Sequence, residues 1–473
     1  MSHPITKVFK AYDIRGLAPG ELDAAFAKRL GQVLVELYKP KSVLVGRDMR
    51  ISSPELEAAL IEGLTTGGAN VVRIGLCTTP MFNVSVGIGA EAYDLGVMVT
   101  ASHNPGKYNG FKLVKGDATP IGQGSGMEEI RDRFMSDTAF ESVAARGLVA
   151  DDTKALAAYL DKVFSLTDVS RIPPMKIAVD AGNGMNGLIM PELAKRLPQC
   201  TFFALYWEPD GNFPHHEANP LKSETLEDLR RLVGSTQSAV GVAFDGDGDR
   251  VGFMDETGLP IPGDLMTALL AESLLASAPG SKILYDLRSS WATKEAIESA
   301  GGVPVMSRVG HAFIKRRMRD EGGLFAGELS MHYYFRDLWN VESGDLCLLL
   351  LLRLLAQTGK PLSALWKPLK TYAKTEEINS EVTDPAGGSS GAGKDAALRR
   401  IDEKYRASVS SVTDMDGLRM EFGVGPDGAK SPDAWWFSVR ASNTEPLLRL
   451  IVEAVSEKVM AEKREELLQM LRA

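Results

Sequence analysis

The sequence predicts an α/β protein made of three homologous mixed α/β domains, followed by a smaller α+β domain of different design. Three observations lead to this prediction. One order of elements occurs three times along the chain, each copy leads to an apolar strand that ends on polar residues, and roughly the last hundred residues break the pattern.

The repeated pattern occupies residues 41–75, 175–206 and 281–310. Each copy consists of a short apolar strand, a polar turn that contains an aspartate, a helix and a second strand. The turn aspartates are Asp48, Asp180 and Asp286. Strand, helix and strand with short connections favour parallel pairing and right-handed crossovers, so we expect three domains of the same architecture.

Each copy leads to a further apolar strand that ends abruptly on polar residues. The three sequences are LGVMVTASHN from Leu95, VGVAFDGDGDR from Val240 and GGLFAGELS from Gly322. Ligands of open α/β sheets collect at the carboxyl ends of the strands. We therefore expect three loops of different chemistry to face one cleft.

The C-terminal region follows a different plan. Residues 383–395, TDPAGGSSGAGKD, predict a Gly/Ser-rich loop within strands and helices that fit an α+β domain. Residues 457–473 predict an amphipathic helix that covers a sheet, because its polar face mixes both signs of charge. The expected domains are 1–152, 153–257, 258–370 and 371–473.

The composition of the 473 residues is that of a soluble globular protein, with 44% hydrophobic and 24% charged residues. A formal net charge of −9 argues against a general nucleic-acid surface. The longest apolar run, residues 346–352, is too short to span a bilayer, and the N-terminus lacks the apolar segment of a secretory signal. Three widely spaced cysteines without metal-ligand spacing indicate a reducing compartment, and we expect a cytoplasmic protein.

The segment DGDGDR places three carboxylates, Asp245, Asp247 and Asp249, at alternate positions between glycines. Hard oxygen ligands at this density suit Mg²⁺ or Ca²⁺. A calcium EF-hand is one alternative, since Glu256 falls at the twelfth position of such a loop. Against it, Arg250 occupies the position that needs glycine, and the preceding residues predict a strand instead of a helix. We favour Mg²⁺, with the calcium loop and a metal-free acidic turn as alternatives.

Ser102 and His103 in TASHNP raise the possibility of a serine hydrolase. Neighbouring side chains point in different directions from an extended backbone, which makes a hydrogen bond between them awkward, and no GxSxG motif surrounds Ser102. A serine that carries a phosphoryl group would need a metal and cations within reach. The aspartate loop and Lys112 in NGFK would supply both. An ordinary loop serine is the alternative.

The segment GELSMH contains Glu328, Ser330 and His332, which alternation along an extended loop would place on one side. A carboxylate and a hydroxyl suit the recognition of sugar hydroxyls, and histidine titrates near neutrality. His311 opens a helix for which the sequence predicts a solvated basic face. The basic residues of that helix are Lys315, Arg316, Arg317 and Arg319.

The segment RASNTEP combines a cation, two hydroxyls and an amide, which together can surround a phosphate. The residues concerned are Arg440, Ser442, Asn443 and Thr444. A polar hairpin turn is the alternative.

The segments TASHNP, DGDGDR, GELS and RASNT, in this order and with FKAYDIRG near the start, closely resemble the α-D-phosphohexomutase superfamily, in particular its bacterial phosphomannomutase/phosphoglucomutase branch. The resemblance extends from end to end of the chain. It implies a heart-shaped arrangement of three homologous α/β domains and a smaller, TBP-like C-terminal domain. In order, these domains would carry a phosphoserine loop, a metal loop, a sugar-recognition loop and a phosphate-binding loop.

The resemblance also implies residue roles. Ser102 would be the serine that is phosphorylated in the resting enzyme, with Asp245, Asp247 and Asp249 as Mg²⁺ ligands beside its phosphate. Glu328 and Ser330 would bind the sugar hydroxyls. Lys112 and His332 would take part in catalysis, both as candidates for proton transfer. The remaining substrate-binding positions would be Arg15, His103, Arg250, Arg288, His311, Arg440, Ser442, Asn443 and Thr444.

The implied reaction is the reversible interconversion of hexose 1-phosphate and hexose 6-phosphate, with mannose and/or glucose as the sugar. It would proceed through phosphoserine and a bound hexose 1,6-bisphosphate that reorients, with Mg²⁺ as cofactor. We expect small-molecule sugar phosphates as the partners, no nucleic acid, no membrane, and a monomer or weak homodimer.

Two positions depart from the family pattern. Arg288 stands where many members have lysine, and Leu329 stands where GEMS would have methionine. Phosphoglucosamine mutases typically show GEQS in this loop, so Leu329 argues mildly against that alternative. A Mg-dependent sugar-phosphate phosphatase and a non-catalytic calcium- or sugar-phosphate-binding protein are further alternatives.

Overall fold

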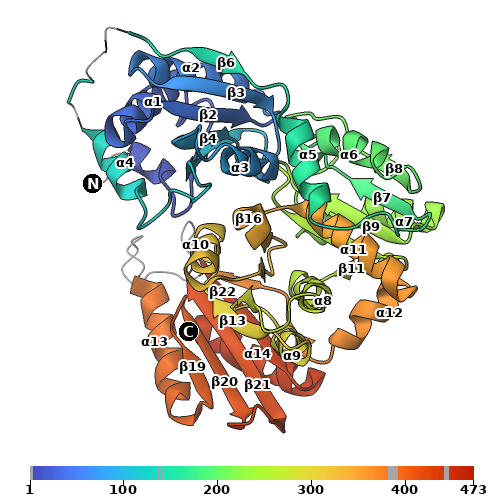
Figure 1. Cartoon of the computed structure of the whole chain (residues 1–473). Helices are drawn as coiled ribbons and strands as arrows, with labels where there is room; N and C mark the ends of the chain where they lie inside the picture. The colour runs from blue at the N-terminus through green and yellow to red at the C-terminus, as the bar shows by residue number, and fades with distance from the viewer. Residues whose placement is uncertain are drawn as a thin grey trace. The chain divides into compact units, whose positions relative to one another are not determined.

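The chain forms two units (Figure 1). The computed structural model describes residues 4–136, 138–140, 143, 145–381, 392–441 and 447–472. Unit 1 comprises Met1–Met266 and Gly310–Leu365, and unit 2 comprises Thr267–Val309 and Trp366–Ala473. Helices α8 (Gly263–Leu275) and α12 (Leu362–Trp366) contain two of the points where the chain passes between the units.

The first sheet of unit 1 has six strands in the order β1-β5-β4-β2-β3-β6. These strands are β1 (Ile14–Leu17), β2 (Ser42–Arg47), β3 (Asn70–Leu76), β4 (Leu95–Val99), β5 (Tyr108–Lys115) and β6 (Val149–Asp151). Strand β2 pairs in parallel with β3 and β4, whereas β5 runs antiparallel to β4 and β1. Strands β4 and β5 therefore lie side by side and run in opposite directions.

Helices cover both faces of this sheet, as the blue part of Figure 1 shows. They are α1 (Ala24–Tyr38), α2 (Ser53–Thr66), α3 (Thr79–Ile88) and α4 (Met127–Met135). Helices α1, α2 and α4 share one apolar core with alternate residues of the strands, such as Val43, Val45 and Val97. Gly96 faces the other way, toward Phe82 of α3. Alternation along the strands thus assigns one face to three helices and the opposite face to α3.

Polar residues set the starts of these helices. The Asp23 carboxylate accepts the Phe26 N–H of α1 at 2.8 Å, and Thr78 Oγ1 accepts the Met81 N–H of α3 at 3.1 Å. Each cap satisfies a helix donor that has no partner within the helix. Pro80 in the first turn of α3 lacks the N–H that would otherwise need a partner.

The second sheet of unit 1 has the order β11-β10-β9-β7-β8. Its strands are β7 (Lys176–Asp180), β8 (Thr201–Leu205), β9 (Val240–Phe244), β10 (Val251–Asp255) and β11 (Pro260–Ile261). The associated helices are α5 (Ala155–Ser165), α6 (Asn186–Lys195) and α7 (Glu227–Thr236). Strands β9 and β10 form an antiparallel hairpin, and the aspartate loop is its turn.

The rest of unit 1 carries the sugar-loop segment on short strands. These elements are α10 (His311–Glu321), β14 (Phe325–Gly327), β15 (Tyr333–Phe335), β16 (Val341–Glu342) and α11 (Gly344–Thr358). Helix α11 holds the apolar run of residues 346–352, all of which are buried. Among the described residues, no single helix is long and apolar enough to cross a membrane, although α11 and the following 362–369 segment pass that test together as a pair bent by 89°.

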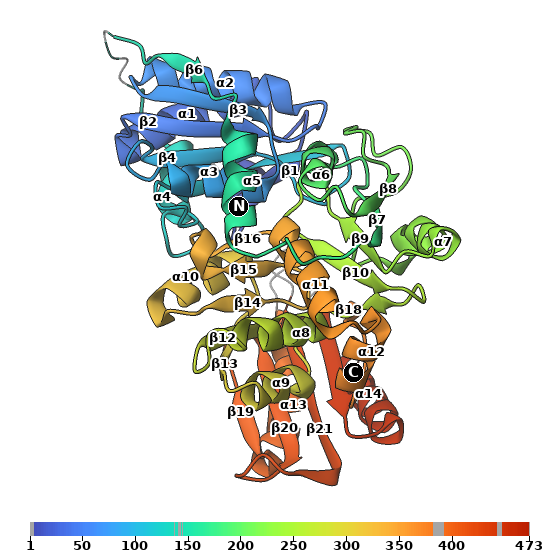
Figure 2. The same cartoon turned by 45° about the vertical axis from the view of Figure 1, so that its right-hand side comes forward.

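Unit 2 contains a parallel strand pair with its helix and the C-terminal sheet. The first elements are β12 (Lys282–Asp286), α9 (Trp291–Ser299) and β13 (Val303–Ser307). The later elements are β17 (Ala373–Lys374), β18 (Ile378–Glu381), α13 (Ala392–Tyr405), β19 (Ser411–Thr413), β20 (Leu418–Val424), β21 (Lys430–Ala441), β22 (Leu447–Ala454) and α14 (Glu457–Arg472). The sheet has the order β17-β22-β21-β20-β19, with β18 also on β22, and it shares one core with α13 and α14. Strands β19, β20 and β21 of this sheet lie in the lower part of Figure 2.

Short 3₁₀ turns complete the described elements. They cover Pro4–Val8, Ser223–Leu226, Arg336–Leu338, Lys367–Leu369 and Arg406–Ser408.

The predicted threefold repeat is confirmed. The three copies fold as β2-α2-β3, β7-α6-β8 and β12-α9-β13, and the two strands of each copy pair in parallel. The C-terminal region is an antiparallel sheet with helices, as predicted, and the terminal helix is α14. Most of the predicted loop over 383–395 lies outside the described residues. The predicted end of the loop at residue 395 is wrong, because α13 begins at Ala392.

Candidate active site

The three aspartates of DGDGDR converge at the end of β9. Asp245, Asp247 and Asp249 are buried, and one carboxylate oxygen of each lies within 4.8 Å of the others. Gly248 adopts a φ of +74°, and a Cβ at this position would lie 1.9 Å from Asn186 Oδ1. Glycine is therefore needed to turn the loop this tightly.

The loop is not an EF-hand. Strand β9 precedes it and strand β10 follows it, in place of two helices. Glu256 bonds to the backbone N–H of Ser363 at 3.1 Å and also accepts the Ser363 hydroxyl. The EF-hand alternative is therefore wrong, because strands flank the loop and Glu256 binds Ser363.

Ser102 follows β4 and reaches the aspartate cluster although 143 residues separate it from Asp245. Its Oγ donates to Asp245 Oδ2 at 3.0 Å, and the side chain is buried. Its Oγ also lies 3.1 Å from His103 Nδ1. The expectation of an extended backbone, which spoke against a Ser–His hydrogen bond, is wrong, because Ser102 has a left-handed φ of +52°.

Lys112 on β5 lies within the same cluster. Its Nζ donates to Asp247 Oδ2 at 2.6 Å and to Asp249 Oδ2 at 2.5 Å. Thr79 Oγ1, at the start of α3, donates to Asp247 Oδ2 at 2.5 Å. Burial alone would lower the pKa of Lys112, but the two carboxylates raise it above its ordinary value. Lys112 is thus a fixed cation beside Ser102's acidic partners.

The donor set fits a hard divalent cation. Three carboxylates meet at one point, and Asp247 Oδ1 is buried without a hydrogen-bond partner among the described residues. Burial, followed by repulsion from Asp249 and Asp247, raises the pKa of Asp245 well above its usual range. A divalent cation would offset that repulsion, since bound cations are the largest local charges in such sites.

Two arginines border Ser102 and its acidic partner. Arg15 donates from Nη1 to Asn104 Oδ1 at 2.9 Å and pairs with Asp13. The Arg250 N–H donates to Asp245 Oδ1 at 3.1 Å, and its Nε lies 4.0 Å from Asp245 Oδ2. Burial, followed by the charges of Arg250 and Arg15, lowers the pKa of His103 well below its usual value. His103 is therefore neutral at neutral pH.

The GELSMH residues lie together as expected, but the predicted reason is wrong, because residues 328–332 form a turn with Met331 at a φ of +66° and not an extended loop. His332 Nδ1 lies 3.5 Å from Glu328 Oε2 and 3.4 Å from Ser330 Oγ. His332 Nε2 lies 3.2 Å from Asp249 Oδ1. His332 thus connects the sugar-loop segment to the aspartate cluster.

His311 lies at the start of α10, with its ring centroid 6.4 Å from that of His332. Burial, followed by the charges of Lys315 and Lys112, lowers the pKa of His311 well below its usual value. The prediction of a solvated basic face is wrong for Lys315, which is buried and pairs with Glu342 at 2.6 Å. A buried charge needs an oppositely charged partner, and Glu342 is that partner for Lys315.

Arg288 and Arg440 belong to unit 2. Arg440 Nη2 lies 3.1 Å from Glu377 Oε2, and Arg288 Nη1 lies 3.5 Å from the same oxygen. Arg449 Nη1 contacts the other Glu377 oxygen at 3.2 Å. Three arginines therefore gather round one carboxylate. Ser442, Asn443 and Thr444 lie outside the described residues.

Sequence reasoning missed several residues of the site. Thr79 and Asn186 contact the aspartate loop, and Arg50 contacts the Ser102 loop. The only local signal was the segment RDMR, in which an aspartate precedes an arginine by two positions, as it does again in YDLR with Asp286 and Arg288.

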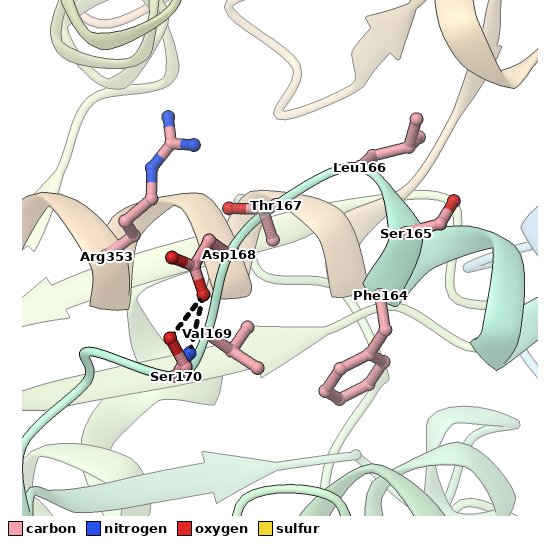
Figure 3. Close-up of a pocket in the computed structure, with 8 residues that line it drawn as sticks. All are labelled: Phe164, Ser165, Leu166, Thr167, Asp168, Val169, Ser170 and Arg353. Carbon is pink, nitrogen blue, oxygen red and sulfur yellow. Dashed lines mark hydrogen bonds between the residues drawn. The ribbon is translucent and has the colours of Figure 1, made fainter.

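A separate open pocket of about 580 Å³ lies between the loop after α5 and helix α11 (Figure 3). Its lining residues are Phe164, Ser165, Leu166, Thr167, Asp168, Val169, Ser170 and Arg353. None of the predicted site residues lines it, so the site rests on the cluster round Ser102 and not on this pocket.

Family sequence models cover nearly the whole chain. Models of the phosphoglucomutase/phosphomannomutase family match as alpha/beta/alpha domain I over residues 6–141, domain II over 157–258 and domain III over 262–372. The C-terminal domain of the same family matches residues 377–470.

Individual proteins agree with these matches. The chain is 40% identical to the phosphohexose mutases protein of Xanthomonas campestris pv. campestris (strain B100), over 96% of this chain and 97% of that one. It is 37% identical to the phosphomannomutase of Salmonella montevideo, over 98% of each chain. A crystal structure of a phosphoglucomutase/phosphomannomutase family protein from Burkholderia thailandensis superposes with a TM-score of 0.84 at 32% identity, over 98% of this chain and 97% of that one.

Three α/β domains and a different C-terminal domain, with a serine beside an acidic cluster, define the class of hexose-phosphate mutases. The chain belongs to the phosphoglucomutase/phosphomannomutase family, and the resemblance seen in its motifs is confirmed. It is accordingly an enzyme, an isomerase that acts on hexose phosphates.

Proposed function

We propose that the chain interconverts the 1-phosphates and 6-phosphates of mannose and glucose through a phosphorylated Ser102. The observation that carries this proposal is the buried position of Ser102 Oγ, 3.0 Å from Asp245 Oδ2, in a cluster that also holds Lys112. A serine in such a cluster has acidic ligands for a metal and a cation for a phosphoryl group at hand. Glucose and mannose differ only at C2, so a site that reads O3 and O4 should accept both.

We propose Mg²⁺ as the cation held by Asp245, Asp247 and Asp249 together with the phosphate on Ser102. Carboxylate oxygens are the ligands that Mg²⁺ prefers, and the unpartnered Asp247 Oδ1 supports the assignment. When bound, Mg²⁺ neutralises charge on the phosphoryl group that is being transferred.

The reaction balances as two opposite transfers. In the first, the P–Oγ bond of phosphorylated Ser102 breaks, a bond forms to O6 of a hexose 1-phosphate, and the O6 proton passes to a base of the enzyme. The hexose 1,6-bisphosphate then reorients. In the second, Ser102 Oγ takes the phosphoryl group from O1, and O1 receives a proton. His332, which contacts the aspartate cluster, is our candidate for these proton transfers, whereas Lys112, held as a cation by two carboxylates, would stabilise the charge on the phosphoryl group.

We propose that Glu328 and Ser330 bind the sugar hydroxyls, with His311 beside them. Glu328 is held by the Gly310 N–H at 2.9 Å and by the Tyr334 hydroxyl at 2.6 Å, so its carboxylate has a fixed orientation. The remaining phosphate contacts would come from the charged and polar groups round Ser102 and in unit 2. These are Arg15, His103, Arg250, Arg288, Arg440, Ser442, Asn443 and Thr444.

We further propose domain boundaries at 152/153, 257/258 and 370/371, which the spans of the four family matches support. We propose a cytoplasmic monomer or weak homodimer whose partners are sugar phosphates. Cys77 and Cys347 are buried free thiols, in keeping with a reducing compartment.

The test is an assay with glucose 1-phosphate or mannose 1-phosphate, Mg²⁺ and a trace of the matching hexose 1,6-bisphosphate, followed by ³¹P NMR. The 6-phosphate should appear without net inorganic phosphate. Net release of phosphate would indicate a phosphatase instead, and much faster turnover of glucosamine 1-phosphate would indicate a phosphoglucosamine mutase.

Ser102→Ala should lower turnover by about 1000-fold or more, because the variant has no oxygen to carry the phosphoryl group. Ser235→Ala, at an exposed serine of α7, is the matched control and should behave as the wild type. Turnover of Ser102→Ala at the wild-type level would remove Ser102 from the mechanism.

A further inference from the structure

The loop after β4 folds round the side chain of one arginine. Arg50 Nη2 donates to the Ser102 carbonyl at 2.7 Å and to the Asn104 carbonyl at 2.6 Å. Arg50 Nη1 donates to the Pro105 carbonyl at 2.9 Å and to the Tyr108 carbonyl at 3.0 Å. Four backbone carbonyls of residues 102–108 therefore converge on one guanidinium.

The fifth donor of Arg50 is also used. Its Nε donates to Asp48 Oδ2 at 3.0 Å, and both side chains have 0% exposure. A guanidinium has five N–H donors in a rigid fork, and here each has an acceptor. A buried charge is costly unless it is paired and fully hydrogen-bonded. Full pairing explains how this arginine is held in the interior.

Asp48 in turn is fixed from two further directions. Its Oδ1 accepts the Arg50 N–H at 3.0 Å and the Ser53 hydroxyl, at the start of α2, at 2.6 Å. The Arg50 guanidinium also lies over the Phe213 ring, 5.3 Å from its centroid. Arg50 is thus anchored to the end of β2 and the start of α2, and it transmits that fixed position to the Ser102 loop.

Ser102 needs such support. Its φ of +52° lies in the left-handed region that non-glycine residues rarely adopt. Residues held in such conformations persist only where the surrounding structure over-determines them. The Arg50 bond to the Ser102 carbonyl acts directly on this residue, and the bonds to the next carbonyls fix the turn that follows it.

We infer that Arg50, which contacts neither the acidic cluster nor Ser102 Oγ, is a positioning residue that sets the orientation of Ser102 for phosphoryl transfer. The inference rests on the proposed function, because it assumes that Ser102 accepts and donates the phosphoryl group. The inference assigns to Arg50, in the RDMR segment of the first repeat, a role that Arg288, in the YDLR segment of the third repeat, does not share. There, Arg288 donates from both Nε and Nη2 to the Asp286 carboxylate, and its Nη1 lies 3.5 Å from Glu377 Oε2.

The test compares Arg50→Met and Arg50→Lys with Arg47→Met. Arg47 lies three residues away and pairs with Glu57 at 3.0 Å without contacting residues 102–108, so it controls for the loss of a partly buried arginine. Dephosphorylated enzyme is mixed with Mg²⁺ and glucose 1,6-bisphosphate, and the rate of Ser102 phosphorylation is followed by intact mass. Mn²⁺ binding and the unfolding temperature are measured in parallel.

Arg50→Met should slow Ser102 phosphorylation by about 100-fold, because small misplacements of a reacting group cost factors of this size. Arg50→Lys should slow it less, since an ammonium reaches some carbonyls but lacks the planar fork. Both should bind Mn²⁺ within twofold of the wild type, and Arg47→Met should phosphorylate Ser102 at the wild-type rate.

A wild-type phosphorylation rate in either folded Arg50 variant would overturn the inference. So would failure of both variants to fold or equal loss of Mn²⁺ binding, because the role would then be general stability and not the orientation of Ser102. If the wild-type enzyme itself gained no phosphate on Ser102, the proposed function would fail first, and the two failures are thereby distinguished.

Discussion

Asp345 is a buried carboxylate at the start of α11 whose partners come from two other helices. Its Oδ1 accepts Asn186 Nδ2 at 3.0 Å and its Oδ2 accepts the Tyr159 hydroxyl at 2.5 Å. Burial raises the pKa of Asp345 to about 6, although both hydrogen bonds lower it. Asn186 also touches Gly248, so this cluster lies directly behind the aspartate loop.

The raised pKa of Asp345 predicts a pH-dependent stability. The folded state binds the proton more tightly than the unfolded state, so the stabilising contribution is complete below about pH 4 and is lost as pH rises through about 6. Relative to Asp345→Asn, the wild type should gain about 2 kcal/mol in free energy of unfolding between pH 7.5 and pH 4.5, from 1.4 kcal/mol per pKa unit. Urea titrations at several pH values measure this difference.

The control for this experiment is Asp337→Asn, at a carboxylate that is 55% exposed. The difference in free energy of unfolding between Asp337→Asn and the wild type should change little over the same pH range. A pH-independent difference between the wild type and Asp345→Asn would contradict the prediction.

At the residue scale, sequence reasoning found the reactive groups but not the residues that hold them. Ser102, Asp245 and Lys112 stand in recognisable segments, because their chemistry needs particular side chains at particular places. Arg50 and Asn186 stand in segments with no comparable pattern. Their partners are backbone carbonyls and a distant loop, and nothing in a local pattern specifies such contacts.

At the element scale, helices α1 and α2 approach so closely that two glycines are required between them. A Cβ at Gly63 would lie 2.0 Å from the Lys28 carbonyl oxygen, and one at Gly31 would lie 2.5 Å from the Leu60 carbonyl oxygen. Both obstacles are backbone atoms, so neither can move without shifting a helix.

Gly63→Ala should therefore lower the free energy of unfolding by about 2–3 kcal/mol, at the upper end of the usual cost of overpacking. Gly234→Ala in α7 is the matched control. Apart from its chain neighbours and its own helix backbone, no heavy atom of the described residues lies within 4 Å of the added Cβ, and the substitution should stabilise by about 0.5–1 kcal/mol because alanine is the better helix former. Denaturant titrations measure the free energy of unfolding of both variants. Equal changes in Gly63→Ala and Gly234→Ala would contradict the close contact between α1 and α2.

The elements themselves followed from the sequence to a large extent. Apolar strands ending in aspartate turns identified β2, β7 and β12, because strand periodicity and turn residues are local signals. Helix α10 was placed correctly, but the environment of Lys315 was not. The pairing of that lysine with Glu342 joins a helix to a strand 27 residues later, a relation that helical periodicity does not contain.

At the scale of the whole molecule, the three repeats share one atomic detail. Each turn aspartate accepts the N–H two residues later: Asp48 from Arg50 at 3.0 Å, Asp180 from Gly182 at 2.7 Å and Asp286 from Arg288 at 2.7 Å. The common turn ends a strand in the same way three times. The side chains that leave the turns differ, so one backbone design serves loops with different functions.

In unit 2, a buried carboxylate joins residues far apart in the chain. Glu453 Oε1 accepts the Trp291 N–H at 2.9 Å and Trp436 Nε1 at 2.7 Å. Glu453→Ala should lower the hydrogen-exchange protection of unit 2 by about 2–4 kcal/mol, because two buried donors lose their acceptor. Unit 1 should keep its protection.

Hydrogen exchange with mass spectrometry separates the two units in one experiment. Glu453→Gln retains an acceptor oxygen and should lose less protection than Glu453→Ala. Equal loss in both units would mean that they unfold together and would contradict a local role for Glu453.

The sequence by itself determined the repeated α/β plan, the different C-terminal domain, the family and the segments that carry the chemistry. These are properties of local pattern, and short-range preferences encode them. Only the tertiary structure decided that Ser102 has a left-handed backbone conformation and that its hydroxyl lies beside His103. It also decided that this hydroxyl binds Asp245 from another domain and that Arg50 supports the Ser102 loop. Those features arise where segments distant in sequence pack against each other, and their energies depend on burial and on complete pairing of donors with acceptors.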